Sequence, residues 1–153
     1  MTIDQNIVTE FQTKAQMAFE DLAREFNLDL CHEDELTFVL IAATFEIRLY
    51  VYPSHVPSAN ITIMPVGPEW NEWRQKSVWG RSGVWLAHLA AFYNAESQYL
   101  DTHFRTTQEL GACLEKLVGV LREVGRDLLQ GDPIILQKLI AYADERVKRS
   151  RSE

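Results

Sequence analysis

Cysteine is scarce in this chain, and the patterns that mark secreted, metal-binding or membrane proteins are missing. The 153 residues include two cysteines, Cys31 and Cys113, too few for a disulfide framework and not arranged in the paired clusters that zinc requires. No apolar run is long enough for a transmembrane helix, and the N-terminus lacks a basic segment followed by an apolar one. We therefore expect a cytoplasmic protein with reduced thiols, without a metal ion or cofactor and without membrane contact.

Basic residues are also in the minority. Lysine and arginine number 15 against 22 aspartates and glutamates, which gives a formal net charge of -7 at pH 7. The negative field around such a chain repels phosphate backbones, so we expect no nucleic-acid partner. The same charge favours solubility or a basic protein partner.

Motifs for catalysis and nucleotide binding are absent as well. The segment 80–83 lacks the spacing of either phosphate-binding fingerprint and predicts a turn before a helix. Cys31 and His32 are neighbours in a predicted strand, where consecutive side chains point to opposite faces, so we do not expect them to share a metal ion. Ser82 and His88 are six residues apart, which does not place them on one helical face. We predict no catalytic residue.

The first half of the sequence predicts one helix followed by strands. Apolar residues recur at helical spacing from Asp4 to Phe26, and Asn27 is suited to end that helix. A change to alternating apolar and polar residues then indicates strands, and the almost continuous apolar run LTFVLIA indicates a central strand covered on both faces. The predicted strands are residues 28–31, 36–42, 45–52 and 61–64.

The second half of the sequence has helical periodicity. Thr106 and Glu109 form a capping-box pattern before a long apolar stripe, and Gly131 is placed to end that helix. Asp132 and Pro133 predict the start of the last helix. The predicted helices cover residues 69–76, 84–94, the apolar stripe 110–128, and 133 onward.

Strands and helices are therefore segregated along the chain, which is typical of an α+β fold. We predict an N-terminal helix, a four-stranded and mostly antiparallel sheet, and three or four C-terminal helices packed on one sheet face. The length and the lack of repeats or linkers predict a single domain over residues 1–153, with 144–153 as a frayed basic tail.

The most unusual feature is the concentration of tryptophan. All four tryptophans of the chain lie between residues 70 and 85. Tryptophan anchors many protein interfaces because it buries a large rigid surface and keeps one hydrogen-bond donor. The alternative is that these rings only cover the sheet as part of the core. We predict a binding surface that consists of Trp70, Trp73, Trp79 and Arg81.

A non-catalytic protein-binding domain is the function that these features favour. One alternative is an enzyme or small-molecule binder with a pocket between sheet and helices, near Trp79, Arg81, Ser82 and His88. Another is a homo-oligomer whose exposed aromatic residues form only its subunit interface. The partner is thus expected to be another protein or a second copy of the chain.

Two families share parts of this pattern. The first half resembles type III secretion chaperones, which are small acidic chains with an N-terminal helix followed by strands that here read LTFVLIA, FEIRLYVYP and ITIMPVG. The second half departs from that family, which returns to two further strands before a last helix. The whole order is similar to that of small bacterial immunity-type proteins, which neutralise partner toxins. Both resemblances imply a binding role and transfer no site residue.

Overall fold

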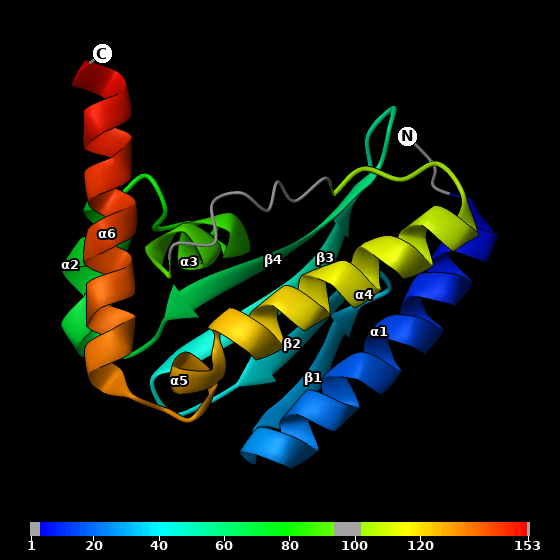
Figure 1. Ribbon diagram of the computed structural model, residues 1–153, viewed down its shortest axis with the longest axis horizontal. Coiled ribbons are helices and arrows are strands. Elements are labelled where there is room, and N and C mark those ends of the chain that lie inside the picture. Colours follow the sequence, from blue (N-terminus) through cyan, green and yellow to red (C-terminus); the bar gives the residue numbers. More distant parts are fainter. Residues whose placement is uncertain (1–3, 94–101, 153) are drawn as a thin grey trace.

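The structure is a computed structural model that describes residues 4–93 and 102–152 (Figure 1). The predicted order of a helix, strands and then helices is confirmed, and the fold is α+β. The elements are α1 (Gln5–Phe26), β1 (Asp29–Asp34), β2 (Thr37–Ile41), β3 (Phe45–Tyr52), β4 (Ser58–Pro65), the 3-10 helix η1 (Pro68–Trp70), α2 (Asn71–Lys76), β5 (Val84–Trp85), α3 (Leu86–Phe92), α4 (Thr107–Val124), α5 (Arg126–Leu129) and α6 (Pro133–Ser152).

Helix α1 begins and ends where the sequence predicts. The Asp4 carboxylate accepts a hydrogen bond from the backbone N–H of Asn6, which satisfies one of the free donors of the first turn. Asn27 ends the helix in the left-handed conformation at φ 55°, a geometry that asparagine tolerates better than most residues. The apolar stripe faces the sheet, with Ile7, Val8, Phe11, Ala15, Phe19 and Leu22 buried.

The strands form one antiparallel sheet in the order β1-β2-β3-β4-β5. Leu49 of β3 faces Phe38 on one side and Ile61 on the other, so apolar side chains lie in rows across the sheet. Because successive residues of a strand point to opposite faces, β3 divides into two sets. One face carries the buried Phe45, Ile47, Leu49 and Val51, and the other carries Glu46, Arg48, Tyr50 and Tyr52.

The number of strands differs from the prediction of four. The fifth strand, β5, comprises the first two residues of the segment 84–94 that was predicted to be wholly helical. Gly83 precedes it with φ +85°, a conformation that favours glycine, and a Cβ there would lie only 3.0 Å from the carbonyl oxygen of Ile63. This close approach lets Val84 pair with Ile63, and the helix starts two residues later. Residue 94, at the predicted end of this helix, lies outside the described residues.

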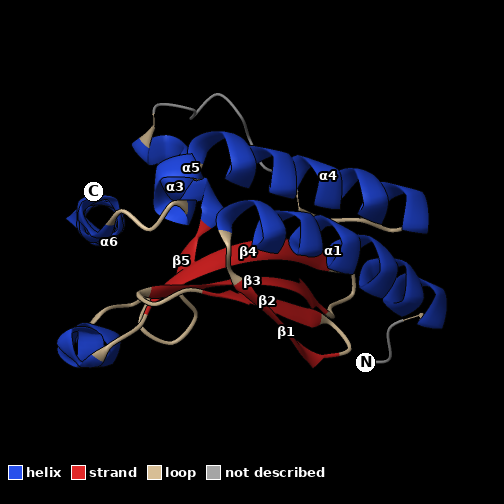
Figure 2. Cartoon of the chain, turned by 90° about the horizontal axis from the view of Figure 1, so that it is seen from below, coloured by secondary structure: helices blue, strands red, loops and turns tan. Residues whose placement is uncertain are grey.

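The layers are uneven on the two sides of the sheet (Figure 2). Helices α1, α3, α4 and α5 all lie over one face, so the predicted packing on one face holds for three of the C-terminal helices. Helix α6 stands at the β5 end and packs on α3 and α5. The opposite face has no helical layer over most of its extent, since among the described elements only η1 and α2 lie on that side, at one end.

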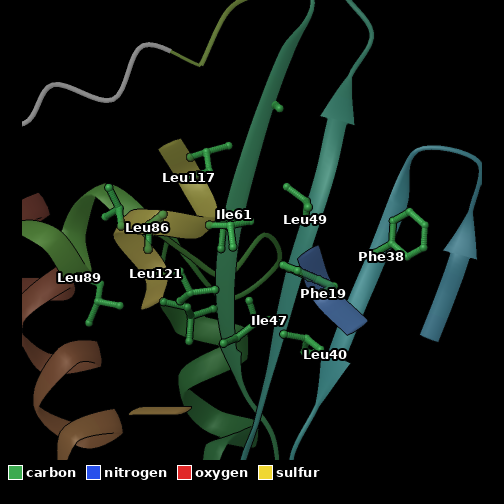
Figure 3. Close-up of a cluster of buried hydrophobic side chains, with 14 of the residues drawn as sticks. Phe19, Phe38, Leu40, Ile47, Leu49, Ile61, Leu86, Leu89, Leu117 and Leu121 are labelled. Carbon is green, nitrogen blue, oxygen red and sulfur yellow. The ribbon is translucent and has the colours of Figure 1, made fainter. Parts of the chain in front are cut away.

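The buried core lies between the sheet and the covering helices (Figure 3). Leu40, Ile47 and Leu49 of neighbouring strands lie close to Phe19 of α1, and Ile61 lies close to Leu117 of α4. All of these side chains are at most 1% exposed. This packing joins the N-terminal helix, the sheet and α4 in one cluster.

The capping box at the start of α4 is confirmed. The N–H of Glu109 donates to the Thr106 hydroxyl, and the Glu109 carboxylate accepts from the N–H of Arg105. The apolar stripe after it was predicted to be one helix up to Gly131, but the chain breaks at Gly125 into α4 and α5. A Cβ at Gly125 would lie 2.4 Å from the carbonyl oxygen of Leu121, so this tight turn depends on glycine.

Helix α6 continues to Ser152, through most of the segment 144–153 that the sequence predicts to fray. Two side chains of that segment, Asp144 and Arg146, contact other elements. Residue 153 lies outside the described residues. None of the helices within 4–93 and 102–152 combines the length and apolar character that a membrane span requires.

Candidate functional site

The four tryptophans lie together at the β5 end of the sheet but differ in exposure. Trp70 is in η1, Trp73 in α2, Trp79 in the turn before β5, and Trp85 in β5 itself. The first three are half-buried and pack against the core, whereas Trp85 is 46% exposed. The cluster is thus part core and part surface, and its most exposed ring, Trp85, is not among the predicted binding residues.

Trp70 and Trp73 form an edge-to-face pair with ring centroids 5.9 Å apart and planes at 82°. The indole N–H of Trp73 donates to the Asp144 carboxylate of α6 at 2.8 Å, and the hydroxyl of Ser77 donates to the other oxygen of that carboxylate at 2.7 Å. Asp144 therefore fastens α6 to α2 and to the residue that follows α2. Trp73 has a structural role, whereas the Trp70 ring pairs with Trp73 and packs partly buried against the core.

Trp79 is held between β5, α3 and α6. Its indole N–H donates to the backbone carbonyl of Ala143 at 3.3 Å, and its ring lies 5.7 Å from Trp85 and 4.7 Å from His88. Both the donor and the ring face are thus used within the chain. The predicted role of Trp79 in partner binding has no free indole donor to support it.

Arg81 is exposed in the turn that leads to Gly83. Within the described part of the chain, no arginine–tryptophan stacking contact is found. The structure places Arg74 differently: its guanidinium donates to the carbonyl oxygens of Pro65 and Gly67 at 3.0 and 2.9 Å. Arg74 thereby fixes α2 to the end of β4 and supports the tryptophan pair.

A groove of about 520 Å³ runs between α2 and α6. Its walls combine aromatic, aliphatic and charged groups, and Val78 at its margin is 48% exposed. Glu72 and Lys76 pair at 2.6 Å on its rim, where both side chains are at least 75% exposed. The lining residues are Glu69, Trp70, Glu72, Trp73, Lys76, Ser77, Val78, Asp144, Val147 and Lys148.

His88 of α3 is half-buried beneath Trp79. Burial, and after it the positive charge of Arg146, lowers the pKa of His88 from 6.5 to about 4. The guanidinium of Arg146 lies 3.3 Å from Nδ1 of His88 and also stacks on the Tyr142 ring at 5.7 Å. A neutral imidazole accepts a hydrogen bond from the arginine at this distance, so His88 serves as a packing and hydrogen-bonding residue near neutral pH.

The residues predicted to line an alternative pocket, Trp79, Arg81, Ser82 and His88, are placed differently by the structure. Arg81 and Ser82 are exposed on the turn, and the Ser82 hydroxyl donates to the carbonyl of Gly83. Trp79 fills the space beside His88. None of these four side chains lines the α2–α6 groove or the two further grooves beside α4.

Cysteine and histidine do not assemble into a metal site in the described ranges 4–93 and 102–152. Cys31 pairs with Val39 and points to the uncovered sheet face, whereas the His32 ring stacks on Phe38 on the helical face at 4.3 Å. Cys113 is 7% exposed, and its thiol donates to the carbonyl of Thr102 at 3.6 Å.

Sequence reasoning missed the uncovered sheet face as a candidate surface. Three of the exposed large hydrophobic residues lie on it, namely Ile41, Tyr52 and Trp85. Arg48 lies at its centre and forms ion pairs with Glu33 and Glu46. The alternation in 45–52 contained a signal for this face, because its polar set includes two tyrosines.

In comparisons with known proteins, no protein-family model, curated protein or solved structure matches the chain.

Proposed function

We propose that this chain is a non-catalytic protein-binding domain that docks a partner at the α2–α6 groove. The observation that carries the proposal is a preformed groove in which half-buried Trp70 and Trp73 lie beside exposed Val78. Interfaces gain most of their energy from a few aromatic anchors in well-packed surroundings. This role agrees with the immunity-type and chaperone-like resemblances of the sequence.

The side-chain contacts that hold the α2–α6 groove in place support docking of a partner there. The Asp144 carboxylate holds Trp73 and Ser77, and Arg74 holds α2 against the end of β4. A surface that is ordered before binding loses less conformational entropy when a partner docks. Trp70 is then the anchor, because its ring lines the groove without carrying the link to α6.

The test is a pull-down from a lysate of the source organism with matched bait variants. Trp70→Ala and Val78→Ser change the groove without touching Asp144, so the fold should persist. Ile134→Ser, which alters another exposed hydrophobic residue, outside the groove, is the control. We expect one stoichiometric partner that the control captures and both groove variants lose.

Capture by folded Trp70→Ala at the level of the unchanged protein would contradict docking at this groove. Trp73→Ala is unsuitable as the main test, because it also removes the donor to Asp144. If no partner is captured, a thermal-shift screen with small molecules follows, since a groove of this volume lies in the range of ligand sites.

A further inference from the structure

The outer edge of β1 is an open pairing site. Strand β1 stands at one end of the sheet order, away from α6 (Figures 1 and 2), and no strand within the described residues pairs with its outer side. All of its residues except Leu30 are exposed. An edge strand of this length presents free N–H and C=O groups that can bind an extended chain.

Two backbone hydrogen bonds between β2 and β3 determine which groups of β1 are free. Ala42 N donates to Phe45 O, and Val51 N donates to Leu36 O, both at 2.9 Å. In an antiparallel sheet, the N–H and C=O of one residue point to the same side, and that side alternates along the strand. Even-numbered residues of β2 therefore bond to β3, and its odd-numbered residues bond to β1.

The backbone N–H and C=O groups of β1 alternate in the same way. Asp29 and Cys31 face the odd-numbered residues of β2, so their backbone groups point inward. The backbone groups of Leu30 and His32 therefore point outward, away from the sheet. They provide two donors and two acceptors for an added strand.

The side chains at this edge differ between the two sheet faces. On the helical face, half-buried Leu30 packs against the core together with Phe26 and Leu28, so an apolar margin stays partly open. On the uncovered face, Asp29 and Glu33 project from the strand. A strand that covered this edge would meet Leu30 and the His32 ring on one side and the carboxylates on the other.

The negative charge of the β1 edge favours a basic partner strand. The segment 29–35 contains the acidic residues Asp29, Glu33, Asp34 and Glu35 and no lysine or arginine. Arg48, which reaches Glu33, is shared with Glu46. Like charges across a strand pair are destabilising and opposite charges are stabilising, so a second copy of this edge is disfavoured and a basic strand is favoured.

We propose that the outer edge of β1 accepts an extended basic segment of a partner protein as an additional strand, in which lysine or arginine alternates with apolar residues. The apolar residues of the segment cover Leu30 and its neighbours, and the basic residues lie opposite Asp29 and Glu33. This surface is separate from the α2–α6 groove, so either proposal can fail without the other.

The experiment uses the full chain and three labelled peptides of equal length. One alternates lysine with valine, one alternates glutamate with valine, and one is the lysine peptide with N-methyl groups on alternate amides. We expect the lysine peptide to bind about tenfold more tightly than either of the others, because opposite cross-strand charges and main-chain hydrogen bonds both contribute. Fluorescence anisotropy gives the affinities.

Two further readouts separate strand addition from non-specific charge attraction. Amide hydrogen exchange of Leu30 and His32 should slow when the lysine peptide is bound. Asp29→Lys/Glu33→Lys should lose the preference for the lysine peptide, whereas Glu115→Lys/Glu123→Lys, with the same change in net charge on α4, should keep it. Equal binding of the three peptides, or unchanged exchange at both amides, would overturn the proposal.

Discussion

Thr62 of β4 is a buried polar residue among the apolar side chains of the sheet. Its side chain is 1% exposed, and its hydroxyl is the one buried side-chain oxygen of the described residues without a hydrogen-bond partner. It lies in the row of the sheet between Arg48 and Trp85, where the large neighbours exclude water. A buried hydroxyl without a partner destabilises the folded state.

We therefore predict that Thr62→Val raises the free energy of unfolding by about 1 kcal/mol, because valine has the same shape without the unsatisfied hydroxyl. Urea denaturation measures the change. Thr62→Ser, which keeps the hydroxyl and removes the methyl group, is the control and should be less stable than the unchanged protein. A less stable Thr62→Val would mean that the hydroxyl has a partner in solution.

His88 makes stability depend on pH. Its pKa of about 4 in the folded protein lies below the ordinary value of 6.5 that applies to the unfolded chain. Between these two values the unfolded chain binds more protons, so the contribution of His88 to stability is complete above pH 6.5 and is lost as the pH falls toward 4. We expect the free energy of unfolding to fall over that interval, and to fall less in His88→Gln.

Proton NMR titration checks the same residue directly, because the ring resonances of His88 should move near pH 4. If these resonances move near pH 6.5 instead, the His88 ring is more hydrated than its packing under Trp79 implies. His88→Gln then should show the same pH dependence as the unchanged protein.

At the scale of elements, Asp144 joins α6 to the tryptophan-bearing segment. Loss of its carboxylate leaves two partly buried donors, on Trp73 and Ser77, without their acceptor. We predict that Asp144→Ala lowers the free energy of unfolding by about 1–3 kcal/mol, the usual cost of unpaired buried groups. Glu145→Ala, at the adjacent exposed position, should change stability by less than about 0.5 kcal/mol. Equal values for the two variants in urea denaturation would show that α6 is held by its apolar contacts alone.

The two edge strands of the sheet differ in how they limit pairing with a second sheet. Strand β1 carries carboxylates at its rim, and β5, at the opposite edge, is only two residues long. Short and charged edges are known to limit pairing between identical chains. The residues that we propose to attract a basic strand thus also oppose self-pairing.

At the scale of the whole molecule, the net charge predicts weak self-association. A charge of -7 and acidic residues along β1 disfavour a dimer that joins these edges. We predict a monomer of 17.6 kDa by light scattering at micromolar concentration. A concentration-dependent dimer at low salt would instead support the homo-oligomer reading, with Ile41, Tyr52 and Trp85 as the exposed residues to substitute first.

The sequence by itself determined the local elements and the fold class. The period of apolar residues specified α1 and strand β3, and the capping box at Thr106 and Glu109 located the start of α4. Such features are readable because they depend on residues a few positions apart. The segregation of strands and helices then predicted the α+β fold with helices on one sheet face.

Only the tertiary structure decided the strand β5 and the roles of the tryptophans. Val84 pairs with Ile63 because Gly83 allows a close backbone approach, which no apolar period encodes. Trp73 reaches an acceptor, Asp144, that lies 71 positions away in the sequence. Local sequence patterns specify which residues are apolar. The contact partner of a half-buried ring depends instead on how distant segments pack. The tertiary structure was therefore needed to tell which tryptophans belong to the core and which to the surface.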